Sequence, residues 1–264
     1  MSLVSSLILG LVQGLTEFLP VSSSGHLVIA AKLLNYQSPG LLLETVVHLA
    51  TTLAVIIYFR KRFWSVISGA FTNGDSRKLV LMLGLAFATT AVIGIGLDRT
   101  GIIDRVFESA VFSGAMLLVT AVALLSVLKL RPPQDSGEQL QVSWKVAVVV
   151  GLAQGIAIFP GISRSGFTIV AGLWGGLGRT SAAEFSFMLS VPTILAASLF
   201  TIWRQPDLSG GNPQDMVIAG VVAFVIGLLA INWLMQWLRK GRLWWFSGYC
   251  AVIGTVSVVY WGIL

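Results

Sequence analysis

Long apolar stretches recur along the whole chain, separated by short polar segments. Six of them come close to the roughly 20 residues that a helix needs to cross a bilayer: 41–59, 79–97, 107–128, 183–203, 216–237 and 244–263. A membrane β-barrel would show weaker alternation in strands of about ten residues. The pattern therefore predicts an all-α polytopic membrane protein with six transmembrane helices.

Two further apolar stretches, 3–35 and 144–178, are interrupted by glycine, proline and a serine-rich turn. Irregular backbone is tolerated at membrane depth only where it is buried in protein or lines a wet cavity. Each stretch is therefore predicted to form a re-entrant helical hairpin, which enters the membrane and turns back.

The two interrupted stretches are copies of one another. Residues 10–30 read GLVQGLTEFLPVSSSGHLVIA and residues 151–171 read GLAQGIAIFPGISRSGFTIVA, with nine of 21 positions identical. An acid, a hydroxyl and an imidazole in the first copy correspond to an isoleucine, a cation and a phenylalanine in the second: Glu17/Ile158, Ser23/Arg164 and His26/Phe167. Two copies that differ in this way predict one composite site, to which each contributes a half.

Basic residues cluster at alternate ends of the spans, and such loops face the cytoplasm. Three spans follow each hairpin, and because three is odd, the second half is predicted to lie upside down relative to the first. The single membrane domain, 1–264, is thus an inverted-topology repeat with halves 1–130 and 144–264, joined by a polar linker at 130–143. Transporters with this architecture place their sites at the repeat interface.

Composition and charge agree with a membrane protein. Hydrophobic residues make up 56% of the chain, charged residues 11%, and mean hydropathy is +0.87, whereas soluble domains are about a quarter charged. The net charge is +6, but the basic residues lie at span ends, which indicates topology and no nucleic-acid partner. The single cysteine, Cys250, excludes an intrachain disulfide.

In the second copy, Arg164 lies between Ser163 and Ser165, ahead of an apolar helix. Free N–H groups at a helix N-terminus bind anions, phosphate above all, and a guanidinium is a planar, permanently charged fork that fits phosphate oxygens. Alternatively, the turn is only a capped helix start whose arginine reaches the membrane surface. Arg164 lies far from either end of its apolar stretch, which favours an anion site.

The matching turn of the first copy carries hydroxyls and a histidine. A helix that begins near Ser22 or Ser23 places Ser23 and His26 on one face, at i and i+3. A serine needs a nearby base to become a nucleophile, and histidine is the usual one near neutral pH. Alternatively, the serines only cap the helix and His26 is an ordinary core histidine. The cation in the other copy favours the chemical interpretation.

Gln13 and Glu17 have helical i, i+4 spacing and therefore share a face. A carboxylate and an amide oxygen suit a hard divalent cation whose shell is completed by phosphate oxygens and water. Two alternatives are that Glu17 orients His26, or that Gln13 and Glu17 form a simple buried hydrogen bond. Glu44 and His48, also i, i+4, lie on the span after the first hairpin. They can pair with each other, hold the hairpin loop or touch the substrate, and structural support is the favoured interpretation.

Three segments together carry a family resemblance. QGLTEFLPVSSSGH at 13–26, PGISRSGFT at 160–168 and AAEFSFMLSVP at 182–192 resemble, in order and spacing, the signature segments of the undecaprenyl-diphosphate phosphatases of the bacitracin-resistance type. The resemblance implies a bacterial inner-membrane enzyme that hydrolyses undecaprenyl diphosphate to undecaprenyl phosphate and inorganic phosphate. This reaction recycles the lipid carrier of cell-wall synthesis and gives bacitracin resistance.

The resemblance also implies an active site that faces the periplasm or cell exterior, a divalent cation, Ca²⁺ or Mg²⁺, and the ability to form homodimers in the membrane lipid. Four positions are implied to be catalytic: Glu17, Ser23, His26 and Arg164. Five are implied to bind the prenyl diphosphate lipid: Gln13, Ser22, Ser163, Ser165 and Thr168. The implied cation ligands are Glu17 and Gln13, of which the neutral Gln13 is the weaker.

A transporter or flippase of a prenyl phosphate lipid is the alternative function, because inverted repeats with broken helices at midplane are what transporters use. The two functions separate in detergent. Release of phosphate from a lipid diphosphate needs no sealed bilayer, whereas transport does.

Overall fold

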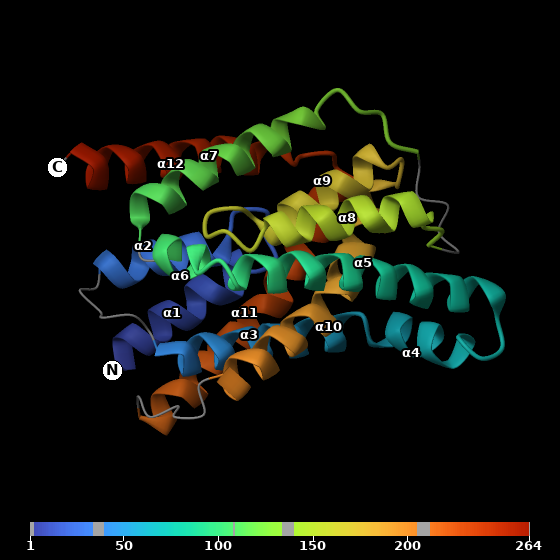
Figure 1. Ribbon diagram of the computed structural model, residues 1–264, viewed down its shortest axis with the longest axis horizontal. Helices are drawn as coiled ribbons and strands as arrows, with labels where there is room; N and C mark the ends of the chain where they lie inside the picture. The colour runs from blue at the N-terminus through green and yellow to red at the C-terminus, as the bar shows by residue number, and fades with distance from the viewer. Residues whose placement is uncertain (1–2, 34–39, 108, 134–139, 205–211, 264) are drawn as a thin grey trace.

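All regular structure in the described part of the chain is α-helical. The computed structural model describes residues 3–33, 40–107, 109–133, 140–204 and 212–263, and no strand occurs among them. Residues 34–35 of the first predicted hairpin and 134–139 of the predicted linker lie outside the described residues. The helices (Figure 1) are α1 (Leu3–Thr16), α2 (Ser23–Leu33), α3 (Gly40–Tyr58), α4 (Arg60–Gly69), α5 (Gly74–Asp98), α6 (Ile102–Phe107), α7 (Ala110–Ser126), α8 (Trp144–Ile156), α9 (Arg164–Trp174), α10 (Arg179–Arg204), α11 (Pro213–Arg239) and α12 (Trp244–Ile263).

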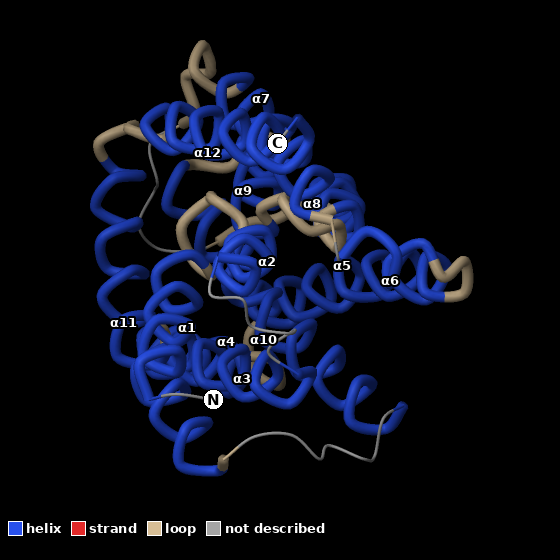
Figure 2. Tube along the Cα trace, turned by 90° about the vertical axis from the view of Figure 1, so that its left-hand side faces the viewer, coloured by secondary structure: helices blue, strands red, loops and turns tan. Residues whose placement is uncertain are grey.

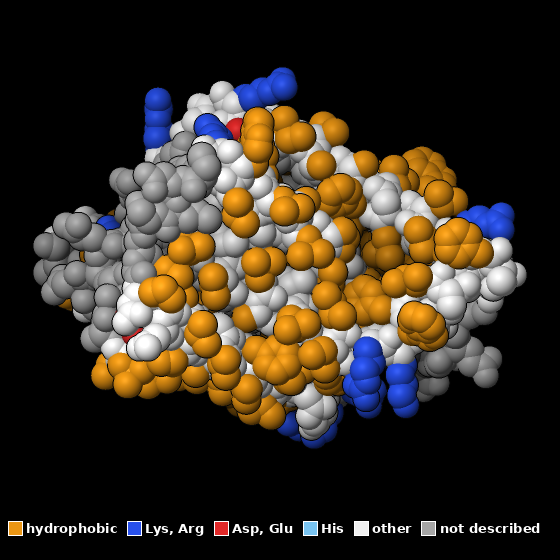
Figure 3. All heavy atoms as spheres, turned by 90° about the horizontal axis from the view of Figure 1, so that it is seen from below, with side chains coloured by type: hydrophobic (Ala, Val, Ile, Leu, Met, Phe, Trp, Pro, Cys, Tyr) orange, Lys and Arg blue, Asp and Glu red, His pale blue; other side chains and the backbone are white. Residues whose placement is uncertain are grey.

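Several of these helices have the length and apolar character of membrane spans. Among the described residues four qualify, α5, α10, α11 and α12, or five if α3 and α4, which are bent by 74°, form one broken span. Figure 3 shows hydrophobic side chains spread over one face, with lysine and arginine side chains at its margins. The chain is therefore a multi-pass, all-helical membrane protein, as predicted. The predicted span at 107–128 contains α7, with 17 residues, and the count of six spans stays a prediction.

The two interrupted stretches each form two short helices joined by a loop. α1 and α8 have 14 and 13 residues, and α2 and α9 have 11 each, all short of the roughly 20 residues that cross a bilayer. Each loop contains one residue with positive φ, Ser22 at 68° in the first and Gly161 at 96° in the second. Each stretch thus has a helix–loop–helix form, while re-entry into the membrane stays a prediction.

The first helix of each hairpin packs against a long helix of the other half. A Cβ atom on Gly10 of α1 would lie 2.5 Å from the carbonyl oxygen of Ala219 in α11. At the equivalent position in α8, a Cβ atom on Gly151 would lie 2.5 Å from the carbonyl oxygen of Ala86 in α5. Small residues let membrane helices approach this closely. The duplicated glycines therefore make the same contact twice, each time between one half and the other.

Other helix pairs surround these two contacts. α7 and α12 lie side by side along one edge (Figures 1 and 2), and the Ser257 hydroxyl of α12 donates a hydrogen bond to the carbonyl of Ala110 in α7 at 3.0 Å. α3 packs against both α10 and α11. The hairpin loops lie between these groups of helices, near the centre of the protein (Figures 1 and 2), and residues 17–22 of the first loop are all buried.

Buried aromatic rings support the first hairpin loop. Phe18, next to Glu17 in the chain, is 0% exposed. Its ring meets the ring of Phe187 on α10 edge-on, with centroids 5.7 Å apart. The centroid of the Phe187 ring also lies 5.8 Å from that of Phe59, the residue between α3 and α4. Such aromatic pairs contribute about 0.5–1.5 kcal/mol beyond the burial of their area. Together these ring contacts hold the backbone at Glu17 in place.

Candidate active site

The two hairpin loops touch through Ser22. The Ser22 hydroxyl accepts hydrogen bonds from the backbone N–H of Gly161, at 3.1 Å, and from that of Gly25, at 3.3 Å. From α7, the Thr120 hydroxyl donates to the Gly161 carbonyl at 2.9 Å and accepts from the Ser163 N–H at 3.0 Å. These contacts join the loops of the two duplicated segments, as a composite site requires.

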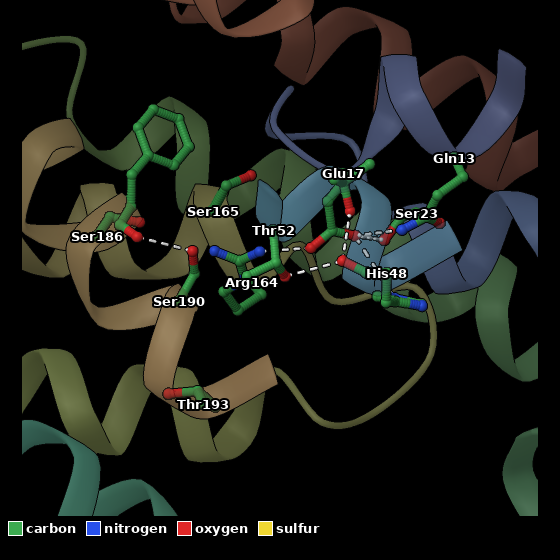
Figure 4. A network of polar contacts seen from close by, with 12 residues as sticks. Gln13, Glu17, Ser23, His48, Thr52, Arg164, Ser165, Ser186, Ser190 and Thr193 are labelled. Carbon is green, nitrogen blue, oxygen red and sulfur yellow. Dashed lines mark hydrogen bonds and ion pairs between the residues drawn. The ribbon is translucent and has the colours of Figure 1, made fainter. Parts of the chain in front are cut away.

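Glu17 lies where the loops meet and is the centre of the polar cluster (Figure 4). One carboxylate oxygen, Oε2, accepts hydrogen bonds from the Ser23 hydroxyl at 2.7 Å and from Gln13 Nε2 at 3.0 Å. The other oxygen, Oε1, forms an ion pair with Nη2 of Arg164. The side chain of Glu17 is only 5% exposed. A buried carboxylate needs such partners, so the first copy supplies the anion and the second supplies the cation that stabilises it.

Arg164, the first residue of α9, uses only one arm of its guanidinium in this ion pair. Nη2 contacts Glu17, whereas Nη1 is buried and makes no hydrogen bond within the described part of the protein. Buried donors in proteins are nearly always paired. An arginine fork binds phosphate oxygens with adjacent N–H groups, so the free arm is suited to hold a phosphate beside Glu17 and Ser23.

His26 does not pair with Ser23, contrary to the prediction. α2 does begin at Ser23, and both residues lie in its first turn. However, the Ser23 hydroxyl bonds to Glu17, while His26 Nδ1 lies 2.7 Å from the Ser22 carbonyl and Nε2 lies 2.9 Å from the Tyr249 hydroxyl. The buried carboxylate is the stronger acceptor for the Ser23 hydroxyl, and the Ser22 carbonyl turns the His26 ring away.

The remaining predicted substrate-binding hydroxyls join the elements of the site to one another. Ser163 caps α9 by accepting from the Gly166 N–H at 3.1 Å, and the Ser165 hydroxyl donates to the Leu19 carbonyl at 3.1 Å. The Thr168 hydroxyl donates to the Arg164 carbonyl at 2.7 Å and lies 2.6 Å from the Ser186 hydroxyl. These contacts fix the start of α9, and with it the direction of Arg164.

Comparison with known proteins agrees with the resemblance noted in the sequence. Residues 6–256 match the family model described as bacitracin resistance protein BacA. The chain belongs to the BacA family. It is 37% identical over 270 residues to the undecaprenyl-diphosphatase of Desulfatibacillum aliphaticivorans, with 96% of each chain covered. It is 38% identical over 280 residues to the undecaprenyl-diphosphatase of Mycolicibacterium smegmatis, covering 99% of this chain and 98% of that one.

This BacA chain also brings His48 of α3 to the site, whereas structural support of the loop was the favoured interpretation of the sequence. His48 Nε2 lies 3.6 Å from Oε2 of Glu17, and Nδ1 lies 2.7 Å from the carbonyl of Glu44. The i, i+4 spacing of Glu44 and His48 in an apolar helix was the one available signal. It did not indicate which way the imidazole turns, and the structure places it over the carboxylate.

Few side-chain oxygen atoms among the described residues of the BacA site are placed to bind a cation. Gln13 is 0% exposed, and its Oε1 atom has no hydrogen-bond partner within the described residues. The Nε2 atom of the same Gln13 amide donates a hydrogen bond to Glu17. The described residues contain no group of three or more His, Cys, Asp or Glu that could hold a metal ion. The Gln13 amide oxygen and the Glu17 carboxylate are the side-chain oxygens that would bind a cation here, with its other ligands from phosphate and water.

Gly161→Ala should destabilise the protein strongly because this position is tightly enclosed. At φ 96°, a Cβ atom would lie 2.1 Å from the Ser113 carbonyl oxygen, so a backbone clash adds to the roughly 1–2 kcal/mol strain of a left-handed alanine. Gly176→Ala is the matched control, since Gly176 has φ 86° and no neighbouring atom within 4 Å of the added Cβ. Thermal unfolding in detergent should show a much lower Tm for Gly161→Ala, and equal Tm losses would contradict the enclosed loop contact.

Proposed function

We propose that this chain hydrolyses undecaprenyl diphosphate to undecaprenyl phosphate and inorganic phosphate, which recycles the lipid carrier of cell-wall synthesis and gives resistance to bacitracin. The observation that carries the proposal is the cluster in which Arg164 holds Glu17 with one arm, while its other arm is buried and has no hydrogen-bond partner among the described residues. Relatives that match nearly the whole chain are undecaprenyl-diphosphatases. A buried cation beside a hydroxyl and a carboxylate is suited to phosphoryl transfer.

In the proposed first step, Ser23 Oγ attacks the terminal phosphorus. The bond from phosphorus to the bridging oxygen breaks, and undecaprenyl phosphate leaves with the electron pair. The proton of Ser23 passes to Glu17, which is supported by their 2.7 Å hydrogen bond. The free arm of Arg164 and the N–H groups at the start of α9 hold phosphate oxygens. Because the leaving group is already a stabilised phosphate, catalysis consists mainly of positioning and charge stabilisation.

In the proposed second step, water hydrolyses the phosphoserine. The new bond joins the water oxygen to phosphorus, the bond from Ser23 Oγ to phosphorus breaks, and Ser23 regains its proton from Glu17. His26 is the candidate base that takes the proton of the water. The competing mechanism has His26 and Glu17 activate water directly, with Ser23 acting only in binding.

The proposed membrane arrangement is an inverted repeat of halves 1–130 and 144–264, with six spans and two re-entrant hairpins. It is supported by the reciprocal glycine contacts of α1 with α11 and of α8 with α5. The proposed location is the bacterial inner membrane, with the site open to the periplasm or cell exterior. Formation of a homodimer is a further prediction, which light scattering of the purified protein in detergent tests.

We propose that Glu17 and Gln13 hold a divalent cation, Ca²⁺ or Mg²⁺, together with the substrate. When bound, the cation would neutralise charge on the diphosphate. Chelation by EDTA should abolish phosphate release, and added Ca²⁺ or Mg²⁺ should restore it. Gln13→Glu supplies a second carboxylate and should lower the cation concentration that gives half-maximal activity. Full activity in EDTA after exhaustive dialysis would exclude the cation.

Phosphate release from undecaprenyl diphosphate by the purified chain in detergent tests the proposed function. Hydrolysis should proceed without a sealed bilayer, and it should be lost in Arg164→Ala because both arms of the guanidinium are removed. A purified, folded chain that releases no phosphate with Ca²⁺ or Mg²⁺ present, yet moves prenyl phosphate across proteoliposome membranes, would favour the flippase instead.

A further inference from the structure

His26 is held at both ring nitrogens, and neither partner belongs to the cluster around Glu17. Nδ1 lies 2.7 Å from the Ser22 carbonyl, and Nε2 lies 2.9 Å from the hydroxyl of Tyr249 on α12. The two rings are also stacked, with centroids 5.6 Å apart and planes 10° from parallel. Tyr249 lies 223 residues from His26 in the chain, and no motif in the sequence points to it. The contact therefore joins the first hairpin to the last helix.

These contacts fix the tautomer of His26. A backbone carbonyl can only accept a hydrogen bond, so Nδ1 must carry the hydrogen that points to Ser22. In the neutral ring, Nε2 then has the lone pair and accepts the hydrogen of the Tyr249 hydroxyl. The nitrogen that can take up a proton is thus Nε2, and the phenol holds it in a defined direction.

We propose that Tyr249 is a positioning residue that holds His26 in the tautomer and orientation in which Nε2 acts as the base. The inference rests on the proposed function, in which Nε2 takes the proton of the water that hydrolyses the phosphoserine. The Tyr249 hydroxyl can rotate about its C–O bond. It donates to the single lone pair of Nε2 in the neutral ring, and its hydrogen turns away when that lone pair takes the proton of the water.

Other titratable groups around His26 are few. Of the helices packed against α2, α1 and α7 carry no titratable side chain. α2 itself carries Lys32 in its last turn, and α12 carries Tyr249, Cys250 and the exposed Tyr260. Cys250 donates to the Pro20 carbonyl instead, at 3.6 Å. Within the described residues, Tyr249 is therefore the one titratable side chain in contact with the ring. The Tyr249 hydroxyl therefore acts on the protonation of His26 directly, and among the described residues it makes no contact with Glu17, the other proton acceptor of the proposed mechanism.

Tyr249→Phe keeps the stacked ring and removes only the hydroxyl. With undecaprenyl diphosphate as substrate and the full chain in detergent, kcat should fall about tenfold, as expected for one lost hydrogen bond, while KM stays unchanged. The acidic limb of the kcat–pH profile should move to higher pH, because the neutral ring loses the donor that favours it. Tyr260→Phe is the matched control, since it removes an exposed hydroxyl from the same helix, and it should leave kcat and the pH profile unchanged.

A double-mutant cycle with His26→Gln separates positioning from other roles. Once His26 is gone, Tyr249→Phe should cost nothing further, because the two residues act as a unit. If the kcat losses of the two single mutants multiply in the double mutant, the inference is wrong. It is also wrong if Tyr249→Phe keeps the wild-type kcat, or lowers kcat without shifting the pH profile. A wild-type chain that releases no phosphate in the same assay would instead refute the proposed function, so the two failures are distinguishable.

Discussion

Arg164→Lys should lower kcat/KM for phosphate release by about 10²- to 10³-fold, the loss that follows removal of a key donor to a developing negative charge. Arg164 can make two contacts at once that a single ammonium group cannot. Nη2 pairs with the buried Glu17 carboxylate, while the buried Nη1 has no partner within the described structure. A lysine is a single point charge without a planar fork, so it can satisfy Glu17 or a phosphate, but not both.

Arg62→Lys is the matched control for this prediction. Arg62 of α4 also pairs with a glutamate, with Nε 3.4 Å from Oε1 of Glu184, but both side chains are more than 20% exposed, at 24% and 22%. Partly exposed pairs contribute about 0–1 kcal/mol, and Arg62 does not belong to the cluster around Glu17. Its replacement should leave kcat/KM near that of the wild type. If Arg164→Lys has the same kcat/KM as Arg62→Lys and an unchanged Tm, the guanidinium fork is not needed.

The sequence predicts most of what depends on length and pattern. Membrane spans follow from apolar stretches because a bilayer demands about 20 such residues, and α5, α10, α11 and α12 are long and apolar enough. The broken hairpins follow from glycine, proline and serine within apolar stretches. The pairing of Glu17 with Arg164 follows from the duplication, because two copies that have diverged at equivalent positions indicate one shared site.

Side-chain directions within the site are set by tertiary contacts that have no local signal. The spacing of Ser23 and His26 suggested a nucleophile and its base, but the backbone of Ser22, at φ 68°, presents its carbonyl to the His26 ring. Ser23 then bonds to Glu17. His48 was visible as an intramembrane histidine, but its approach to Glu17 depends on the packing of α3 beside the first hairpin.

Ser23→Ala should lower kcat by about 10³-fold or more, as expected when a nucleophile is removed. Ser23 has the geometry that the covalent mechanism requires. Its hydroxyl donates to Glu17 at 2.7 Å, and the same carboxylate is paired with the arginine that would hold the phosphate. The loss should appear in kcat more than in KM, because the proposed bond from Ser23 Oγ to phosphorus forms only during the reaction.

Ser24→Ala is the matched control, because Ser24 is the next residue of α2 and its hydroxyl lies 3.4 Å from Ser22, outside the cluster around Glu17. It should retain nearly full turnover. Substrate labelled in its terminal phosphate provides a direct measurement. In His26→Gln the slowed second step should let labelled phosphoserine accumulate at Ser23, whereas Ser23→Ala should carry no label. If Ser23→Ala keeps more than about a tenth of wild-type kcat and no label is trapped in His26→Gln, water attacks directly, because an enzyme without its nucleophile cannot turn over at that rate.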